Sequence, residues 1–303
     1  MLEHDLIKRF FTRKASHSNV TVGVGDDAAV LRIPETHELV TSIDTMVSGV
    51  NFPINTAAED IAYKSLAVSL SDMAAMGAKP NTALLALTLP ETDGSWLSGF
   101  SHGFFECLVA FDVDLIGGDI SKGPLSVTTT LNGLVPKGSA LLRTGAKPGD
   151  AIYVTGSLGD AGLALQQLKA KQTVQDAALR KLNRPTPRIE AGLAIRDFAS
   201  AAIDISDGLA TDLEKLCHAS DVGAQVYVSD IPLSDTLTSS VNELTAITLA
   251  LTAGDDFELC FTASPEHTCD YYKIGHIIEE KGLTFIDKNQ QAFELKQKGY
   301  EHF

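Results

Sequence analysis

Residues 56–80 read TAAEDIAYKSLAVSLSDMAAMGAKP, and this stretch decides how the first half of the chain folds. Thr56 with Glu59 three residues later forms a capping box, and Gly77 followed by Pro80 ends a helix. Between these signals almost every residue from Leu66 to Met76 is apolar. Because a helix that is apolar on all sides is buried, the sequence predicts a buried helix from about residue 57 to 76.

One carboxylate stands in the middle of this apolar helix. Ser69 and Asp72 are three residues apart and therefore share a helix face. A buried carboxylate is costly unless it is paired or bound to a metal ion. A salt bridge to Lys64 or Lys79 is the plain alternative, but burial favours a functional interpretation of Asp72.

Strands and helices alternate on both sides of this helix. In the first half the patterns predict strands at 20–24, 28–33, 38–43, 82–89, 113–116 and 125–135, with a helix at 96–111. In the second half they predict strands at 151–155, 202–205 and 257–262, and helices at 161–170, 189–199 and from 208 to 220. The segment 136–150 is rich in Gly, Pro and Ser and marks a boundary. We therefore expect an α+β protein with domains at 1–138 and 139–303.

The composition narrows the class of function. The 303 residues are 44% apolar and 21% charged, with a formal net charge of −15, which disfavours a nucleic-acid partner. No apolar run is long enough to span a membrane, and the acidic start lacks a signal-peptide pattern. The four cysteines form no C-x-x-C pair, so we expect reduced thiols and a cytoplasmic protein.

Six short acidic segments carry the functional information. Besides the segment at Asp72 they are Gly25-Asp26-Asp27, Ser42-Ile43-Asp44, Gly117-Gly118-Asp119, Asp204–Gly208 and Gly254-Asp255-Asp256. Clustered carboxylates repel one another unless cations hold them together, and Mg²⁺ takes oxygen ligands while leaving positions for phosphate oxygens. The pattern favours an enzyme that handles phosphates through metal ions.

Each segment also has a structural alternative. Gly-Asp is common in turns, which could account for Asp27 and Asp255. A strand-end cap could account for Ser42 and Asp44, which strand alternation puts on the same side. A plain turn could account for Asp119, which we expect after the strand at 113–116, and a helix cap could account for Asp207.

Several common nucleotide-binding patterns are missing or fail. Residues 23–28, GVGDDA, fit G-x-G-x-x-A superficially, but the residues that follow predict a strand and not the required helix. The chain has no P-loop and no protein-kinase motif set. Arg143, in the glycine-rich boundary segment, is either a phosphate clamp or a solvated charge.

The motifs together resemble the thiamine-monophosphate kinases, a family in the aminoimidazole-ribonucleotide-synthetase-like ATP-binding superfamily. The resemblance covers nearly the whole chain. It runs through GVGDDAAV (23–30), SIDTMVSGVNF (42–52), DIAYKSLAVSLSDMAAMGAKP (60–80), LIGGDISKGPLSVTTTLNGLVPKG (115–138), LLRTGAKPGDAIYVTGSLGDA (141–161), AIDISDGLATDL (202–213), AGDDFELCF (253–261) and KGYEHF (298–303).

The resemblance implies transfer of a phosphoryl group from ATP to thiamine monophosphate, with several Mg²⁺ ions and no catalytic side chain. It also implies a homodimer formed through the mixed sheet of the N-terminal domain, and a C-terminal α/β sandwich. By position, the expected metal ligands are Asp27, Ser42, Ile43 through its backbone oxygen, Asp44, Asp72, Asp119, Asp204 and Asp207. The expected nucleotide contacts are Gly118, Asp119, Arg143 and Ser206, and the expected substrate contacts are Asn51, Asp255 and Tyr300.

Four positions depart from the family pattern. Ile43, Asn51, Ile120 and Asp255 stand where the family often has Thr, His, Thr and Glu. The stretch after Cys260 is also short for the family, which affects the placement of Tyr300.

Two other functions remain open from the sequence. A related ATP-dependent ligase or cyclase of the same superfamily would share the metal ligands and differ in its acceptor. A divalent-ion buffering or scaffold protein would bind metal without nucleotide, although the two glycines at 117–118 and the Arg143 loop disfavour it.

Overall fold

The computed structural model describes residues 3–295 and 299 and divides the chain into two compact units. The N-terminal unit comprises residues 1–73 and 78–138, and the C-terminal unit comprises residues 74–77 and 139–303. In the part of the chain that is described, no helix combines the length and the apolar character needed to cross a membrane.

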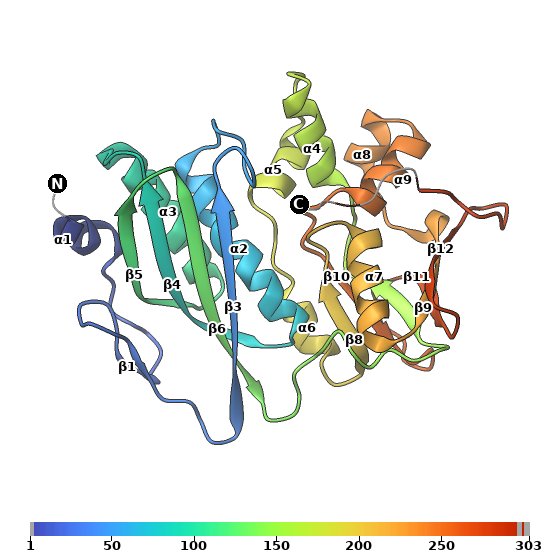
Figure 1. The fold of residues 1–303 in the computed structure, drawn as a ribbon, viewed down its shortest axis with the longest axis horizontal. Helices are drawn as coiled ribbons and strands as arrows, with labels where there is room; N and C mark the ends of the chain where they lie inside the picture. Colours follow the sequence, from blue (N-terminus) through green and yellow to red (C-terminus); the bar gives the residue numbers. More distant parts are fainter. Residues whose placement is uncertain (1–2, 296–298, 300–303) are drawn as a thin grey trace. The chain divides into compact units, whose positions relative to one another are not determined.

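The N-terminal unit is a four-stranded mixed sheet in the order β3-β6-β4-β5 (Figure 1). Only the β4–β5 pair is parallel. Its strands are β3 (His37–Val47), β4 (Lys79–Leu89), β5 (Asp114–Lys122) and β6 (Ser126–Pro136). A short antiparallel ribbon of β1 (Val20–Val22) and β2 (Val30–Leu31) precedes the sheet, after α1 (Glu3–Leu6) and a π-helical turn at Ile7–Phe11.

Two helices, α2 (Ala58–Ala75) and α3 (Gly94–Ala110), lie on one face of this sheet (Figure 1). Leu66, Leu70 and Met73 of α2 are fully buried, which confirms the helix that residues 56–80 predict. Asp93 caps α3 by accepting hydrogen bonds from the N–H groups of Ser95 and Trp96. The two predicted helices therefore cover one face of the sheet.

The other face of the sheet has no helix on it in Figure 1. From Leu39 to Val47 the odd-numbered residues of β3 are exposed, including Leu39 at 44%, Ile43 at 64% and Val47 at 37%. An antiparallel sheet can leave one face to solvent, but that face is normally polar. We call this surface, with Leu39, Ile43 and Val47 along β3, the bare face.

The C-terminal unit is built on a six-stranded sheet in the order β12-β9-β11-β7-β10-β8, in which only the β12–β9 pair is parallel. Its strands are β7 (Ala151–Val154), β8 (Ala199–Asp204), β9 (Gly223–Tyr227), β10 (Leu259–Ala263), β11 (Tyr272–Ile278) and β12 (Gly282–Ile286). Its helices are α4 (Asp160–Lys169), α5 (Asp176–Asn183), α6 (Ile189–Ile195), α7 (Leu209–Ser220), α8 (Asp235–Ser240) and α9 (Glu243–Thr252), with a 3₁₀ turn at Val228–Asp230.

The C-terminal core has two parts. One forms between the sheet and α7, where Ile152, Ile203 and Leu213 are at most 1% exposed. The other joins the helices α4, α5, α8 and α9 through residues such as Leu163 and Leu237. The expected α+β architecture with a mixed N-terminal sheet is confirmed, while α5, α8, α9, β9, β11 and β12 were not predicted.

The contact between α2 and α3 gives a stability test. Gly103 of α3 is buried, and a Cβ atom there would overlap the carbonyl oxygen of Glu59 on α2. We expect Gly103→Ala to destabilise the N-terminal unit by about 1–3 kcal/mol, because the helices must move apart. Urea unfolding followed by the fluorescence of Trp96, the single tryptophan, measures this unit because Trp96 lies on α3.

Gly99→Ala is the matched control on the same helix. A Cβ atom at Gly99 would meet nothing closer than 3.5 Å, so alanine should be neutral or stabilising there. Equal midpoints for the two alanine variants would contradict the assigned close contact at Gly103.

Candidate functional site

Two carboxylates meet between β3 and α2. Ser42 and Asp44 both point toward α2, and Ser69 and Asp72 lie on the facing side of that helix. Ser69 Oγ donates to Asp44 Oδ2 at 2.7 Å, and Ser42 Oγ donates to Asp72 Oδ2. The predictions that each pair shares one side of its element are thus confirmed, and four oxygen-bearing side chains converge.

The electrostatics of this acid pair favour a cation. Burial raises the pKa of Asp44, and hydrogen bonds with Ser69 and Asp72 offset this only in part. Two ionised carboxylates in contact repel each other. A shared proton or a bound cation would remove this repulsion. Carboxylate and hydroxyl oxygens are hard ligands, and this donor set fits Mg²⁺.

Asp119 does not join this pair within one sheet. The strand register aligns Asp44 with Thr129, Leu85 and Gly118 in one row across β3, β6, β4 and β5. Three strand spacings, about 14 Å, therefore separate the row's two ends. Residues 117–119 lie inside β5, so the expectation that they follow a strand ending at 116 is wrong, and so is the alternative of a plain turn.

Asp119 also faces the other way. It pairs with Ala86 in the β4–β5 register, and both residues are exposed on the bare face. Ser121 Oγ donates to Asp119 Oδ2 at 2.8 Å. Asp119 is thus on the opposite face of the sheet from Asp44 and Asp72.

Asp27 and Asn51 lie in loops of the N-terminal unit. Asp27 is exposed in the β1–β2 connection, and its N–H donates to Asp26 Oδ1 at 2.9 Å. The strand expected at 28–33 is reduced to Val30–Leu31. Asn51 follows β3, and its Oδ1 accepts a hydrogen bond from Val47 N at 2.9 Å. The strand at 38–43 is longer than expected and ends at Val47.

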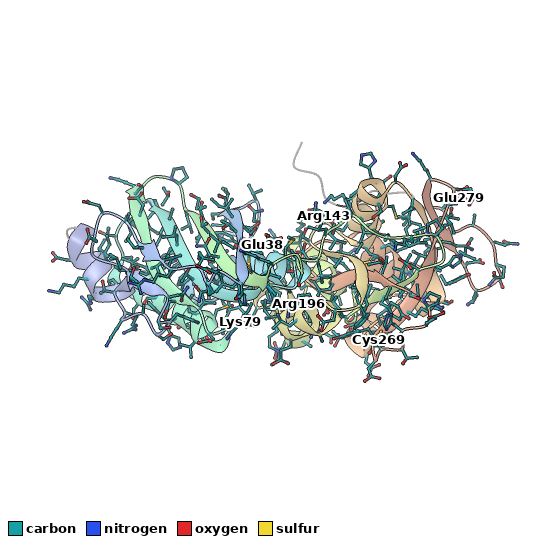
Figure 2. The ribbon with its side chains drawn as sticks, turned by 90° about the horizontal axis from the view of Figure 1, so that it is seen from below. Glu38, Lys79, Arg143, Arg196, Cys269 and Glu279 are labelled. Carbon is teal, nitrogen blue, oxygen red and sulfur yellow. The ribbon has the colours of Figure 1, made fainter. Side chains whose placement is uncertain are left out.

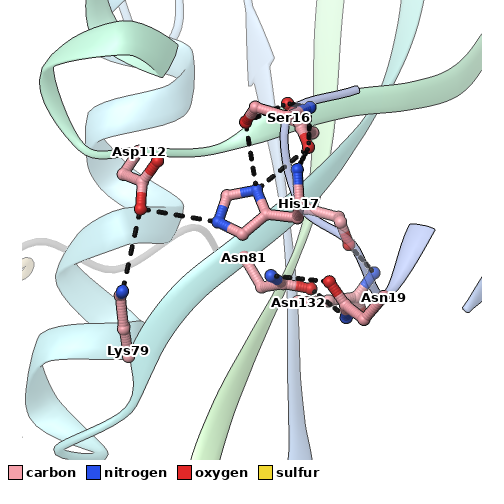
Figure 3. Close-up of polar contacts among 9 residues, drawn as sticks. Ser16, His17, Asn19, Lys79, Asn81, Asp112 and Asn132 are labelled. Atoms are coloured by element: carbon pink, nitrogen blue, oxygen red, sulfur yellow. Dashed lines mark hydrogen bonds and ion pairs between the residues drawn. The ribbon is translucent and has the colours of Figure 1, made fainter. Parts of the chain in front are cut away.

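A second cluster in this unit is structural. The N–H groups of Ser16 and His17 and the ring Nδ1 of His17 contact Asp114 at 2.7 to 2.9 Å. The ring Nε2 of His17 lies 3.5 Å from Asp112 Oδ2 (Figure 3). Burial of Asp114 acts to raise its pKa, but these hydrogen bonds outweigh it and lower the pKa. The cluster fixes the chain before β1 to β5, beside a cavity of about 250 Å³ that His17, Lys79 and Asn81 help to line.

In the C-terminal unit, Asp204 ends β8 and is buried, and the loop 205–208 leads into α7. The N–H groups of Ser206 and Asp207 donate to Asp212 Oδ2 at 2.9 and 2.8 Å. Gly208 is the N-cap residue and no side chain caps the helix, so capping by Asp207 is wrong. Asp212, which the sequence analysis did not single out, shapes this loop from inside α7.

Lys215 neutralises part of this loop. Its Nζ lies 2.6 Å from Asp207 Oδ2 and 2.8 Å from Asp212 Oδ1. Burial of Lys215 opposes its charge, but the hydrogen bonds with Asp207 and Asp212 raise its pKa. Burial raises the pKa of Asp212 despite its bond to Lys215. The i,i+3 spacing of Asp212 and Lys215 on α7 was the sequence signal for this pair.

The remaining candidates are spread over the same unit. Arg143 is exposed in the loop after β6, and its carbonyl oxygen accepts from Ser220 Oγ at 2.8 Å (Figure 2). Asp255 has φ +69° and donates its N–H to Ser206 O at 3.0 Å. Tyr300 lies outside the described residues. Over 3–295 and 299, no group of three or more His, Cys, Asp and Glu side chains is placed to hold a metal ion.

Comparison with known proteins identifies the two halves. Residues 25–135 match the AIR synthase related protein N-terminal domain, and residues 147–288 match the corresponding C-terminal domain. The chain is 44% identical to thiamine-monophosphate kinase of Escherichia coli K12, over 99% of this chain and 98% of that protein.

Solved structures agree with these matches. Thiamine-monophosphate kinase from Stenotrophomonas maltophilia K279a has a TM-score of 0.86 at 40% identity, covering 92% of this chain and 93% of that one. A structure described as AaThiL complexed with AMPPCP and TMP has a TM-score of 0.82 at 29% identity, covering 99% and 96%. The chain therefore belongs to the thiamine-monophosphate kinase family, built from the two AIR synthase related domains.

Proposed function

We propose that this enzyme transfers the γ-phosphoryl group of ATP to thiamine monophosphate, giving ADP and thiamine diphosphate. The 44% identity to a thiamine-monophosphate kinase over 99% of the chain carries this proposal. The acid pair Asp44 and Asp72, held by Ser42 and Ser69, agrees with it because a reaction between two polyanions needs cation sites.

The reaction needs no general base. A phosphate oxygen of thiamine monophosphate forms the new bond to the γ-phosphorus, while the bond from that phosphorus to the bridging β,γ-oxygen breaks and releases ADP. The second pKa of a phosphate monoester is about 6, so the acceptor is already a nucleophile near neutral pH. The protein's task is to bind, align and desolvate the two anions.

We assign the expected ligands to three roles. Metal ions are to be held by Asp27, Ser42, the backbone oxygen of Ile43, Asp44, Asp72, Asp119, Asp204 and Asp207. The nucleotide is to be bound by Gly118, Asp119, Arg143 and Ser206, and thiamine monophosphate by Asn51, Asp255 and Tyr300. Bound Mg²⁺ would supply charge neutralisation between the phosphates.

One feature of the described residues supports these roles, and another limits the role of Asp207. A Cβ atom at Gly118 would overlap the carbonyl oxygen of Leu85, so this position has no room for a side chain. A glycine backbone is what a phosphate can approach closely. The ion pair of Asp207 with Lys215 limits its role, since one of its oxygens already has a cationic partner.

We further propose that the enzyme is a homodimer joined through the bare face. Leu39, Ile43 and Val47 are exposed on an edge strand, where Thr41 and Thr45 lie between them, and exposed apolar side chains grouped on one face favour an interaction surface. Asp119 lies on the same face, so a second copy would cover it. The unit 1–138 would then supply dimerisation and metal ligands, and 139–303 would complete the nucleotide and substrate sites.

We propose that the enzyme is located in the cytoplasm. The cysteines Cys107, Cys217, Cys260 and Cys269 are all free thiols. Burial raises the pKa of the Cys217 thiol to about 11, which keeps it protonated and unreactive.

A coupled assay of ADP release tests the reaction. We expect ADP to form only when ATP, Mg²⁺ and thiamine monophosphate are all present, with thiamine diphosphate as the second product. ADP release that requires a formylglycinamidine-type acceptor instead would identify a related ligase or cyclase. If calorimetry detects metal binding but no nucleotide binding, the proposed kinase activity is refuted.

Asp44→Asn should separate activity from stability. We expect turnover to fall by about 100-fold or more, because the site loses a carboxylate that helps hold cations. The pKa of Asp44 is raised in the folded protein, so the wild type loses stability as pH rises from the unfolded-state pKa through the folded one. The neutral Asn does not lose this stability.

The melting temperature of Asp44→Asn relative to wild type should therefore increase between pH 4 and pH 7. Added Mg²⁺ should raise the melting temperature of the wild type more than that of the variant. If Mg²⁺ raises the melting temperature of both proteins equally, Asp44 is not a metal ligand, even if the variant is inactive.

The dimer is tested by light scattering after size-exclusion chromatography. Leu39→Glu places a charge on the bare face and should convert a wild-type dimer to a monomer. Val109→Glu is the control, because Val109 is 79% exposed on α3 and away from that face. A monomeric wild type, or a dimeric Leu39→Glu, would disprove an interface through the bare face.

A further inference from the structure

The segment between α9 and β10 contains two residues in an unusual backbone conformation. Asp255 has φ +69° and Phe257 has φ +50°, both in the left-handed region. Non-glycine residues are strained there and persist only where their surroundings enforce the conformation. Asp256 lies between them, so the segment must be held at this point.

Asp256 supplies a side-chain anchor. It is 6% exposed, and both of its carboxylate oxygens accept the N–H of Gly159, at 3.0 and 2.9 Å. Gly159 is the N-cap residue of α4, with φ +92°. A Cβ atom there would lie 2.8 Å from Ala250 N, so only glycine fits this junction.

The backbone on both sides of Asp256 is tied to the loop before α7. Asp255 N donates to Ser206 O at 3.0 Å, and Phe257 N donates to Ile205 O at 2.8 Å. A Cβ atom at Gly254 would lie 2.5 Å from Ser206 O, which shows how closely the two loops pack. The conformation of Asp255 is therefore coupled to the loop that contains Ser206.

Asp256 does not share the ion pairs of its neighbour. Glu258, two residues on, binds Arg188 Nε at 2.6 Å and Thr155 Oγ1 at 2.7 Å, and Lys181 lies 3.4 Å away. Burial raises the pKa of Asp256 well above its ordinary value, and the hydrogen bond from Gly159 N offsets this only in part. At 6% exposure Asp256 is also closed off from a ligand in solvent.

We propose that Asp256 is a positioning residue for the substrate contact at Asp255. Its bond to Gly159 holds Asp255 and Phe257 in the left-handed region, and this fixes the direction in which the Asp255 side chain leaves the backbone. This inference rests on the proposed function, because Asp255 is there assigned to thiamine monophosphate.

A double-mutant cycle tests the coupling. Asp256→Ala should raise the KM for thiamine monophosphate about tenfold, and clearly more than it raises the KM for ATP, because it releases Asp255 directly and the loop of Ser206 only through Asp255. In an Asp255→Ala background the same change should not raise the KM for thiamine monophosphate further, since the carboxylate that Asp256 orients is already absent. If the KM increase in the double variant equals the product of the increases in the two single variants, the two residues act independently and Asp256 does not position Asp255.

Two further variants keep the test interpretable. Asp256→Asn retains an oxygen for Gly159 N and should restore a KM within about threefold of wild type. If Asp256→Ala does not fold, Asp256→Ser removes the same contact in its place. An asparagine variant as impaired as the alanine or serine one would also reject the anchor.

The matched control is Asp150→Ala. Asp150 is 7% exposed in the same unit and accepts hydrogen bonds from Lys147 N at 3.0 Å and Ser200 Oγ at 2.6 Å. Its loss should lower the melting temperature without changing the KM for thiamine monophosphate. The wild-type assay comes first: absence of thiamine-monophosphate-dependent ADP release refutes the proposed function, whereas an active wild type with multiplying effects refutes only the role of Asp256.

Discussion

Burying a carboxylate away from water costs free energy, and both units contain buried carboxylates that must be compensated by hydrogen bonds or positive charge. The two units compensate them differently. In the N-terminal unit Asp44 receives a hydrogen bond from the neutral hydroxyl of Ser69 and contacts a second acid, Asp72. In the C-terminal unit Asp212 has the ammonium group of Lys215 and two backbone N–H donors. The first arrangement brings two acids into contact, and a cation between them would relieve their repulsion.

The buried helix α2 links this constraint to the fold. Because α2 is apolar on almost all sides, it is covered by the sheet and by α3. Its few polar side chains must therefore face these neighbouring elements. Ser69 and Asp72 face β3 at the height where Ser42 and Asp44 alternate inward. The same packing that stabilises the unit thus determines which oxygens meet, and a residue such as Gly103, which allows α3 to approach, contributes to the site indirectly.

Local patterns predicted the elements whose signals are local. The helix at α2 and the pairing of sides for Ser42 with Asp44 and Ser69 with Asp72 followed from capping and periodicity. The six missed helices and strands of the C-terminal unit are mostly short, and tertiary packing defines them more than a local pattern does. The alternative that Asp207 caps the helix is wrong because Gly208 takes the N-cap position. The hydrogen bonds of the Ser206 and Asp207 N–H groups to Asp212 depend on how the loop folds back, which no local pattern shows.

The position of Asp119 shows what no local pattern can supply. Sequence motifs gather Asp44 and Asp119 into one list of metal ligands, but the strand register places them on the two edge strands and on opposite faces of the sheet. The row that contains Asp44 reaches the edge strand β5 at Gly118, next to Asp119, about 14 Å away. Two oxygens that bind one Mg²⁺ lie at most about 4 Å apart, since each Mg–O distance is about 2.1 Å. If both residues bind metal within one copy, they must therefore bind different ions. The alternative is that a second copy, seated on the bare face, brings its own ligands to Asp119, and in that case dimerisation is part of the catalytic site and not only a source of stability.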